Sequence, residues 1–87
     1  MVFEVATGDN YFAPADLVIS VGDAVRWRNV GAVAHTTTSG SRAGPSGLWD
    51  AVLDVGASYT RTFDTPGTFA YFCIIHIGQN GKVTVNP

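Results

Sequence analysis

Three side chains in this sequence have the chemistry of metal ligands. They are the single cysteine, Cys73, and the only two histidines, His35 and His76. His76 follows Cys73 by three residues, so a short loop can bring a thiolate and an imidazole to the same ion. His35 lies far upstream, and it can join the pair if the fold brings the ends of two distant strands together.

Each of these residues also has an ordinary structural explanation. A lone cysteine is often a small buried hydrophobe, a lone histidine is often hydrogen-bonded, and a Cys-x-x-His pair is a weak signal by itself. The joint pattern is stronger, because every cysteine and histidine of the chain fits one scheme. Two imidazoles and one thiolate with a weak axial ligand are typical of blue-copper electron-transfer sites. The pattern therefore predicts one copper ion per chain, alternating between Cu(I) and Cu(II).

The elements that must position these ligands are short strands separated by Gly, Pro, Asn and Asp. Alternation is clearest over 24–29, where Val25 and Trp27 share one face, and no stretch of ten or more residues keeps a helical period. Six to eight strands without a helix predict an all-β, antiparallel sandwich or barrel. The strands are expected at Val2–Thr7, Leu17–Val21, Ala24–Asn29, Ser58–Phe63, Thr68–Cys73 and Gly81–Val85.

Two details of this organisation are less regular. The strands 58–63 and 68–73 are expected to pair with each other across a type II turn at 65–68, because Pro66 and Gly67 suit its two central positions. Ser39–Asp54 is rich in Gly, Ser and Ala without a clear period, so we expect a long loop with a short helical turn there. Trp27 is expected in the core, Trp49 is left open, and Arg42 and Asp50 are expected on the solvated surface or in contact with a partner.

Length and composition restrict the class of protein. Eighty-seven residues, 46% of them apolar, predict one folded domain covering 1–87. One cysteine excludes an internal disulfide, which leaves a metal as the stabilising element for a small core. The five basic residues are few and scattered, so nothing indicates nucleic acid, and no apolar run approaches the length of a membrane span.

Two longer motifs carry a resemblance to a known family. The first is Leu17-Val18-Ile19-Ser20-Val21-Gly22-Asp23-Ala24-Val25-Arg26-Trp27-Arg28-Asn29, which continues to Ala34-His35-Thr36. The second is Asp64-Thr65-Pro66-Gly67-Thr68-Phe69-Ala70-Tyr71-Phe72-Cys73, then His76, then Gly81-Lys82-Val83-Thr84-Val85. Over nearly its whole length the chain resembles the plastocyanin and amicyanin branch of the cupredoxins. The resemblance implies a Greek-key β-sandwich that transfers single electrons through a type 1 copper ion and is not an enzyme.

The resemblance also implies roles for individual residues. His35, Cys73 and His76 match the equatorial ligands. The carbonyl of Ala34 matches a position that approaches copper weakly in some members, and the amide of Thr36 matches a donor to the cysteine sulfur.

The axial position departs from the short-loop members of the family. They carry a methionine three residues after the second histidine, whereas this chain has Gln79. Glutamine is the axial ligand in the stellacyanin-like branch, so the side-chain oxygen of Gln79 can take this role. The alternative is that Gln79 points away and leaves the position to water or empty.

The loop around His76 is expected to be the surface where electrons leave. In the resembled family the imidazole edge lies at the surface, and an apolar patch there suits transient redox protein partners. The residues expected to form this patch are Val33, Ile74, Ile75, Ile77 and Gly78. The alternative is that the isoleucines simply cover the copper ion. We expect a monomer, in the periplasm or outside the cell, or an excised domain of an exported or membrane-anchored protein.

Other functions remain open at this point. With an open axial position, the copper ion of an enzyme would react with a small ligand such as nitric oxide. A copper-handling module would use the same ligands and release Cu(I) readily to a chelator. A bare interaction domain without metal would leave the placement of Cys73 and both histidines unexplained.

Overall fold

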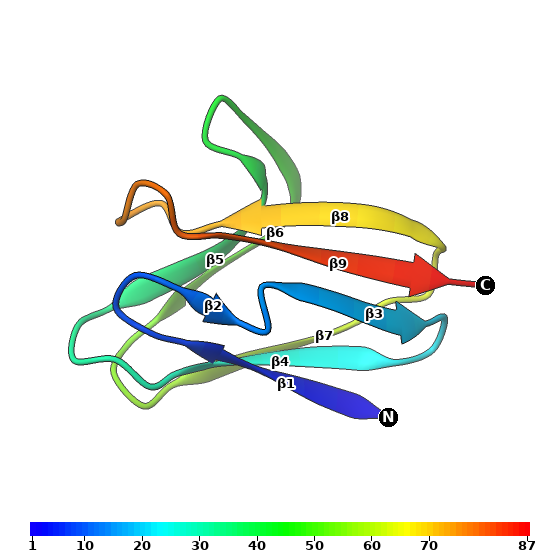
Figure 1. Ribbon diagram of the computed structural model, residues 1–87, viewed down its shortest axis with the longest axis horizontal. Helices are drawn as coiled ribbons and strands as arrows, with labels where there is room; N and C mark the ends of the chain where they lie inside the picture. The colour runs from blue at the N-terminus through cyan, green and yellow to red at the C-terminus, as the bar shows by residue number, and fades with distance from the viewer.

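The computed structural model describes residues 1–87 and contains strands and no helix. Two sheets, with strand orders β2-β1-β4-β7 and β3-β9-β8-β5-β6, pack as a sandwich (Figure 1). This confirms the expected all-β sandwich, with nine strands in place of six to eight. The strands are β1 (Val2–Thr7), β2 (Phe12–Ala13), β3 (Asp16–Ser20), β4 (Ala24–Asn29), β5 (His35–Ser41), β6 (Gly44–Leu53), β7 (Ser58–Thr62), β8 (Gly67–Phe72) and β9 (Asn80–Asn86).

Both sheets are mixed, whereas the sequence led us to expect an antiparallel sandwich or barrel. β1 pairs with β4 in parallel, and β3 pairs with β9 in parallel, whereas the other pairs are antiparallel. A parallel pair needs a connection that crosses over. Here the chain leaves β1, passes through β2 and β3, and returns to β4 beside β1.

Aromatic side chains form the centre of the core. Along β4, Val25 and Trp27 are buried while Arg26 and Arg28 are exposed, as the alternation predicted. Trp27 contacts the rings of Trp49 and Tyr71. Trp49 is therefore a core residue too, and its indole N–H donates to Thr37 Oγ1 at 3.1 Å.

The expected loop and helical turn at 39–54 were wrong. This segment is the end of β5 and the whole of β6, which form a protruding hairpin (Figure 1). β6 is an edge strand and buries only Trp49 and Leu53. An edge strand that is exposed along most of its length does not need alternating apolar residues, which is why the sequence lacks a period.

The expected hairpin between 58–63 and 68–73 was also wrong. β7 pairs with β4 in one sheet, and β8 pairs with β5 and β9 in the other. Phe63 is buried where the chain crosses between the sheets, and its backbone bonds to Gly22 and Asp23 at 2.8 and 2.9 Å. A buried aromatic residue at this point holds the crossing in the core.

The sandwich brings three connections to one end. The β1–β2, β4–β5 and β8–β9 loops lie together, and both termini lie toward the opposite end (Figure 1). The fold contains no helix, and therefore no helix that is long and apolar enough to cross a membrane. The three loops carry the residues described next.

Candidate metal centre

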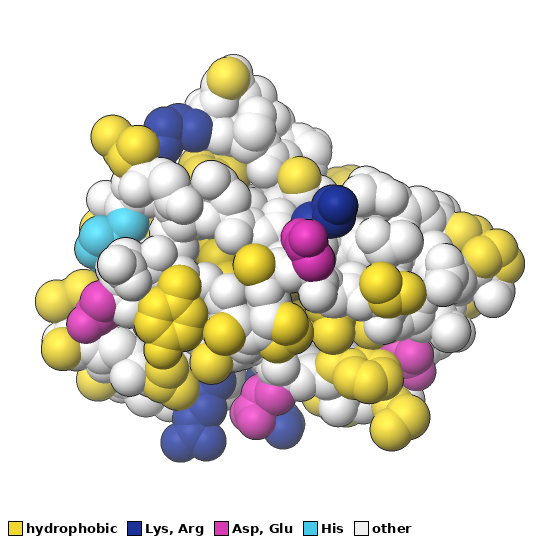
Figure 2. Space-filling model, in the orientation of Figure 1, with side chains coloured by type: hydrophobic (Ala, Val, Ile, Leu, Met, Phe, Trp, Pro, Cys, Tyr) yellow, Lys and Arg dark blue, Asp and Glu magenta, His cyan; other side chains and the backbone are white.

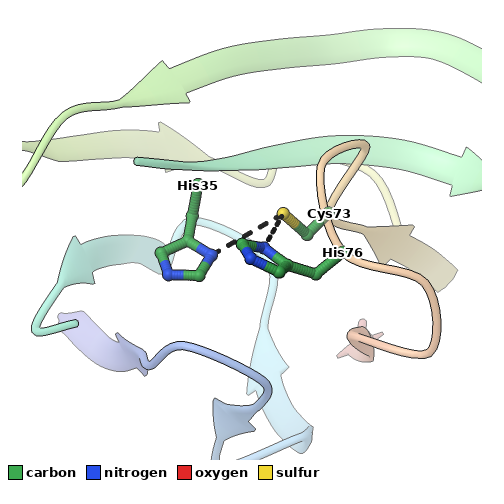
Figure 3. Close-up of side chains that lie close together, drawn as sticks. All are labelled: His35, Cys73 and His76. Atoms are coloured by element: carbon green, nitrogen blue, oxygen red, sulfur yellow. Dashed lines mark hydrogen bonds between the residues drawn. The ribbon is translucent and has the colours of Figure 1, made fainter. Parts of the chain in front are cut away.

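The three sequence-predicted ligands meet at the end where the three loops gather. His35 is the first residue of β5, Cys73 directly follows β8, and His76 lies in the β8–β9 loop. The Sγ atom of Cys73 is 3.8 Å from His35 Nδ1 and 3.7 Å from His76 Nδ1 (Figure 3). The three ligand atoms all lie within 4.8 Å of one another. Cys73 and His35 are fully buried, and His76 is half-buried.

Thr36 fixes the cysteine from the β5 side. Its backbone N–H donates to Cys73 Sγ at 3.4 Å, as the resemblance implied. Its hydroxyl oxygen also accepts from the backbone N–H of Ile74 at 2.9 Å. Ala34 precedes His35 and is half-buried. Two bonds from one threonine therefore hold the sulfur and the start of the next loop together.

The β8–β9 loop is closed by its own backbone. The N–H of Cys73 donates to the carbonyl of Gln79 at 2.9 Å, and the N–H of Gln79 reaches the carbonyl of His76 at 3.4 Å. Gly78 has a positive φ of 87°, a conformation that side chains disfavour. This closure places His76 and Gln79 on either side of a tight turn.

Gln79 is buried at the expected axial position, with 1% of its surface exposed. Its amide nitrogen donates to the carbonyls of Gly8 and Tyr11, each at 2.9 Å. These two bonds fix which way the amide points. The other amide atom, Oε1, is buried without a hydrogen-bond partner. A buried acceptor of this kind is costly to leave unsatisfied, so it fits a site that supplies a cation.

Two charged residues at the site were missed by the sequence analysis. Asp9 Oδ1 lies 3.0 Å from His35 Nε2. Arg42 donates to the carbonyl of Cys73 at 2.9 Å and lies over the ring of Phe72. Arg42 was expected on the solvated surface or in contact with a partner, because the β5–β6 hairpin that brings it to the site was not predicted. Asp9 carried no motif that distinguished it from an ordinary turn residue. Asp50, which was left open, accepts from the Thr38 hydroxyl at 2.9 Å.

The surroundings favour the thiolate form of Cys73. Burial raises its pKa, but the hydrogen bond from the Thr36 amide and the hydrogen bonds shared with His76 and His35 outweigh burial and lower the pKa to about 6. Burial also works to lower the pKa of His35, yet its hydrogen bonds to Asp9 and Cys73 raise it above the ordinary value. At neutral pH the site therefore offers the deprotonated sulfur that a metal requires.

The apolar residues that were expected to form a surface patch are exposed. Val33, Ile74, Ile75 and Ile77 all expose large parts of their side chains, and Ile77 is 87% exposed. Figure 2 shows histidine atoms at the surface, with apolar side chains near them at the same end of the molecule. Such exposure favours a surface patch over a cover that only shields the site.

Comparisons with known proteins agree with this geometry. Residues 1–86 match the model of the copper-binding proteins of the plastocyanin/azurin family. The chloroplast plastocyanin of Tetradesmus obliquus is 38% identical over 91% of this chain, which spans 61% of that protein's length. Amicyanin-alpha of Methylorubrum extorquens is 32% identical over 94% of this chain and 70% of its own length.

Solved structures agree as well. A purple cupredoxin from Nitrosopumilus maritimus superposes with a TM-score of 0.86 at 28% identity, covering 97% of this chain and 99% of that one. The curated relatives include several plastocyanins and an amicyanin, in agreement with the resemblance expected from the sequence. With its sandwich fold, its His-Cys-His cluster and a family match over 1–86, the chain belongs to the plastocyanin/azurin family of copper-binding proteins.

Proposed function

We propose that this protein carries single electrons between redox partners through one type 1 copper ion. His35, Cys73 and His76 would hold the ion through two imidazole nitrogens and one thiolate, and Gln79 Oε1 would supply a fourth, weaker ligand. The observation that carries the proposal is the meeting of two Nδ1 atoms and one Sγ atom within 4.8 Å in a largely buried site. When bound, copper supplies a one-electron couple at a moderate potential.

The donor set fits this metal. Copper accepts thiolate and imidazole ligands in both oxidation states. The site offers one thiolate and two imidazoles. Gln79 adds an oxygen that lacks any partner within the protein. Because its amide nitrogen is already bonded to two carbonyls, the oxygen is left as the only free end of this side chain.

The protein's own contribution is to keep the ligands still. His35 begins β5, an interior strand of its sheet, and Cys73 is held by the Thr36 N–H at its sulfur and by the Gln79 carbonyl at its backbone N–H. A ligand set that does not have to move adds little to the barrier for electron transfer. The burial of Cys73 keeps water away from its sulfur.

His76 is the proposed exit for the electron. Of the three proposed ligands it is the only one that is not fully buried, and its neighbours in the β8–β9 loop, Ile74, Ile75, Ile77 and Gly78, are exposed, as is Val33 in the β4–β5 loop. An apolar patch gives close docking without strong directional bonds, so a partner can bind briefly and dissociate. We propose that the protein works as a monomer of one domain, 1–87, in the periplasm or outside the cell.

Reaction with nitric oxide and copper handling are weaker candidates. A reactive site needs an open position, whereas the buried amide of Gln79 occupies the axial side. A handling module needs ligands that let the ion go, whereas two of the three here are fully buried.

Spectroelectrochemistry of the copper-loaded protein tests the proposal. We expect one electron per chain, taken up and released reversibly over repeated cycles without loss of copper. Nitric oxide should leave the spectrum unchanged, and a Cu(I) chelator should remove the ion slowly. Loss of copper on each reduction would favour the handling module, and a nitric oxide adduct would favour the reactive site.

A further inference from the structure

A carboxylate lies behind the buried histidine of the site. Asp9, in the β1–β2 loop, places its Oδ1 atom 3.0 Å from Nε2 of His35. This ring nitrogen is the one opposite Nδ1, which faces the Cys73 sulfur (Figure 3). The His35 side chain is fully buried, whereas the Asp9 side chain is 51% exposed. The carboxylate therefore connects the inner ligand to the protein surface.

Asp9 is itself held in place by a second loop. The backbone N–H of Ala32 lies 2.9 Å from Oδ1 and 3.2 Å from Oδ2 of Asp9. Ala32 belongs to the β4–β5 loop, three residues before His35. A carboxylate bonded at both oxygens has a fixed plane, so its contact with the ring is set by the fold.

Gly31 leaves the room that this contact needs. A Cβ atom at this position would lie 2.1 Å from Asp9 Oδ1 and 3.1 Å from His35 Nε2. Gly31 is not among the glycines with positive φ, so its backbone conformation does not require glycine. The need for glycine at this position is steric, and it is specific to the Asp9–His35 contact.

We propose that Asp9 is a positioning residue for His35, an inference that rests on the proposed function. Its carboxylate accepts the Nε2–H, which fixes the tautomer that leaves the Nδ1 lone pair directed at the metal. Its negative charge also makes the imidazole a stronger donor and stabilises the more positive, oxidised state. Partners of ligating histidines act in this way in other metal sites.

The variants Asp9→Asn, Asp9→Ala and Gly31→Ala separate the parts of this proposal. The first keeps an acceptor and removes the charge, and the second removes both. The third, Gly31→Ala, keeps the Asp9 carboxylate but displaces it from the His35 ring. Asp64→Asn is the matched control, because it removes one exposed carboxylate whose only side-chain bond is to Thr65.

The reduction potential is the first measurement. We expect it to rise in both Asp9 variants and to stay unchanged in Asp64→Asn. Copper affinity should fall by about 10- to 100-fold in Asp9→Ala, as when the hydrogen-bond partner of a metal-bound histidine is removed from other metal sites. Potentials that shift equally in Asp9→Asn and Asp64→Asn would overturn the specific role of Asp9.

The second measurement uses the zinc-loaded protein, since zinc binds nitrogen and sulfur ligands and is diamagnetic. Exchange of the His35 Nε2–H with solvent, followed by NMR, should be slow in the unaltered protein and fast in Asp9→Ala and Gly31→Ala. If Asp9 only held the β4–β5 loop in place, this exchange would stay slow in Gly31→Ala. That result would overturn the proposal.

Different results would contradict the proposed function and the role of Asp9. If the unaltered protein binds no copper, or binds it without a thiolate charge-transfer band, the proposed function is wrong. If the band is present but the potential and the exchange are the same in all Asp9 and Gly31 variants, only the role of Asp9 is wrong.

Discussion

The two sides of the metal site are built differently. His35 is fully buried at the start of a central strand and is bonded to Asp9, which is bonded in turn to Ala32. His76 is half-buried in a loop, and its own carbonyl makes only a long 3.4 Å backbone bond. One side is a framework that the fold has already ordered. The other is a short loop that presents a ligand to the surface.

Cys73 lies between the two sides, and its Sγ atom is 3.8 Å from His35 Nδ1 and 3.7 Å from His76 Nδ1. This comparison shows how a small sandwich can keep a site rigid and still give a partner access. The strands hold the Cys73 sulfur and the buried His35, while the half-buried His76 lies closer to the solvent. The predictions below test that division, starting with the largest expected effect.

Titration of the Cys73 thiol should show the combined action of both sides. Burial raises its pKa, but bonds from Thr36, His76 and His35 lower it from 9.0 to about 6. Thiolate absorbance of the metal-free protein in the ultraviolet should therefore rise with a midpoint near 6. His76→Ala should move the midpoint up. A midpoint near 9 in the unaltered protein would show that neither side acts on the sulfur.

This pKa also sets the sign of a stability change. Between about 6 and 9 the folded chain holds a thiolate and the unfolded chain a thiol, so the unfolded state binds more protons. The Cys73 contribution to the free energy of unfolding therefore rises with pH across this window and is lost as the pH falls through about 6. The raised pKa of His35 works in the opposite sense, since its contribution is lost as the pH rises.

Truncation of the two histidines should have unequal effects on the metal-free protein. His35→Ala opens a cavity in a fully buried site and leaves Asp9 without its partner, so we expect a loss of about 2–3 kcal/mol. His76→Ala should cost less than about 1 kcal/mol, because its side chain is partly in water. Urea unfolding of both variants measures the difference. Equal losses would contradict the division into framework and loop.

Much of this arrangement follows from the sequence, and the reasons for the rest are physical. The ligands could be predicted because Cys73 and the two histidines are chemically distinctive, and β4 could be predicted from the alternation around Trp27. β6 could not, because an exposed edge strand carries no apolar period. The crossing at Phe63 could not, because a turn motif does not say which sheet each strand joins. Asp9 and Arg42 reach the site through tertiary contacts that no local pattern records.

Replacement of Gln79 tests the junction between the loop and the framework. Gln79→Met removes the donor to the carbonyls of Gly8 and Tyr11, although Tyr11 keeps its bond from the Gly8 N–H. We expect the metal-free protein to lose about 1–2 kcal/mol. The reduction potential should rise, because a thioether is softer than an amide oxygen and favours Cu(I). An equal or lower potential would show that Gln79 is not the axial ligand.

A charge on the loop should affect partners without affecting the site. Ile77→Asp changes a side chain that is 87% exposed, so the copper spectrum and stability should stay nearly unchanged. Electron exchange with a redox protein partner, followed by stopped flow, should slow by about tenfold, equivalent to about 1.4 kcal/mol.

The matched control for this variant is Val21→Asp. It places the same charge on an exposed residue of the β3–β4 turn, at the opposite end of the molecule (Figure 1). If both variants slow the exchange equally, docking does not use the patch around His76.

The central claim is that one copper ion is bound through the Cys73 thiolate between the two histidines. The visible spectrum of the oxidised, copper-loaded protein tests it most directly, with Cys73→Ser as the comparison. The unaltered protein should show an intense thiolate-to-copper charge-transfer band at one copper per chain, and the serine variant should lack it because the soft sulfur is gone. A serine variant that keeps the band, or an unaltered protein that never shows one, would contradict the account.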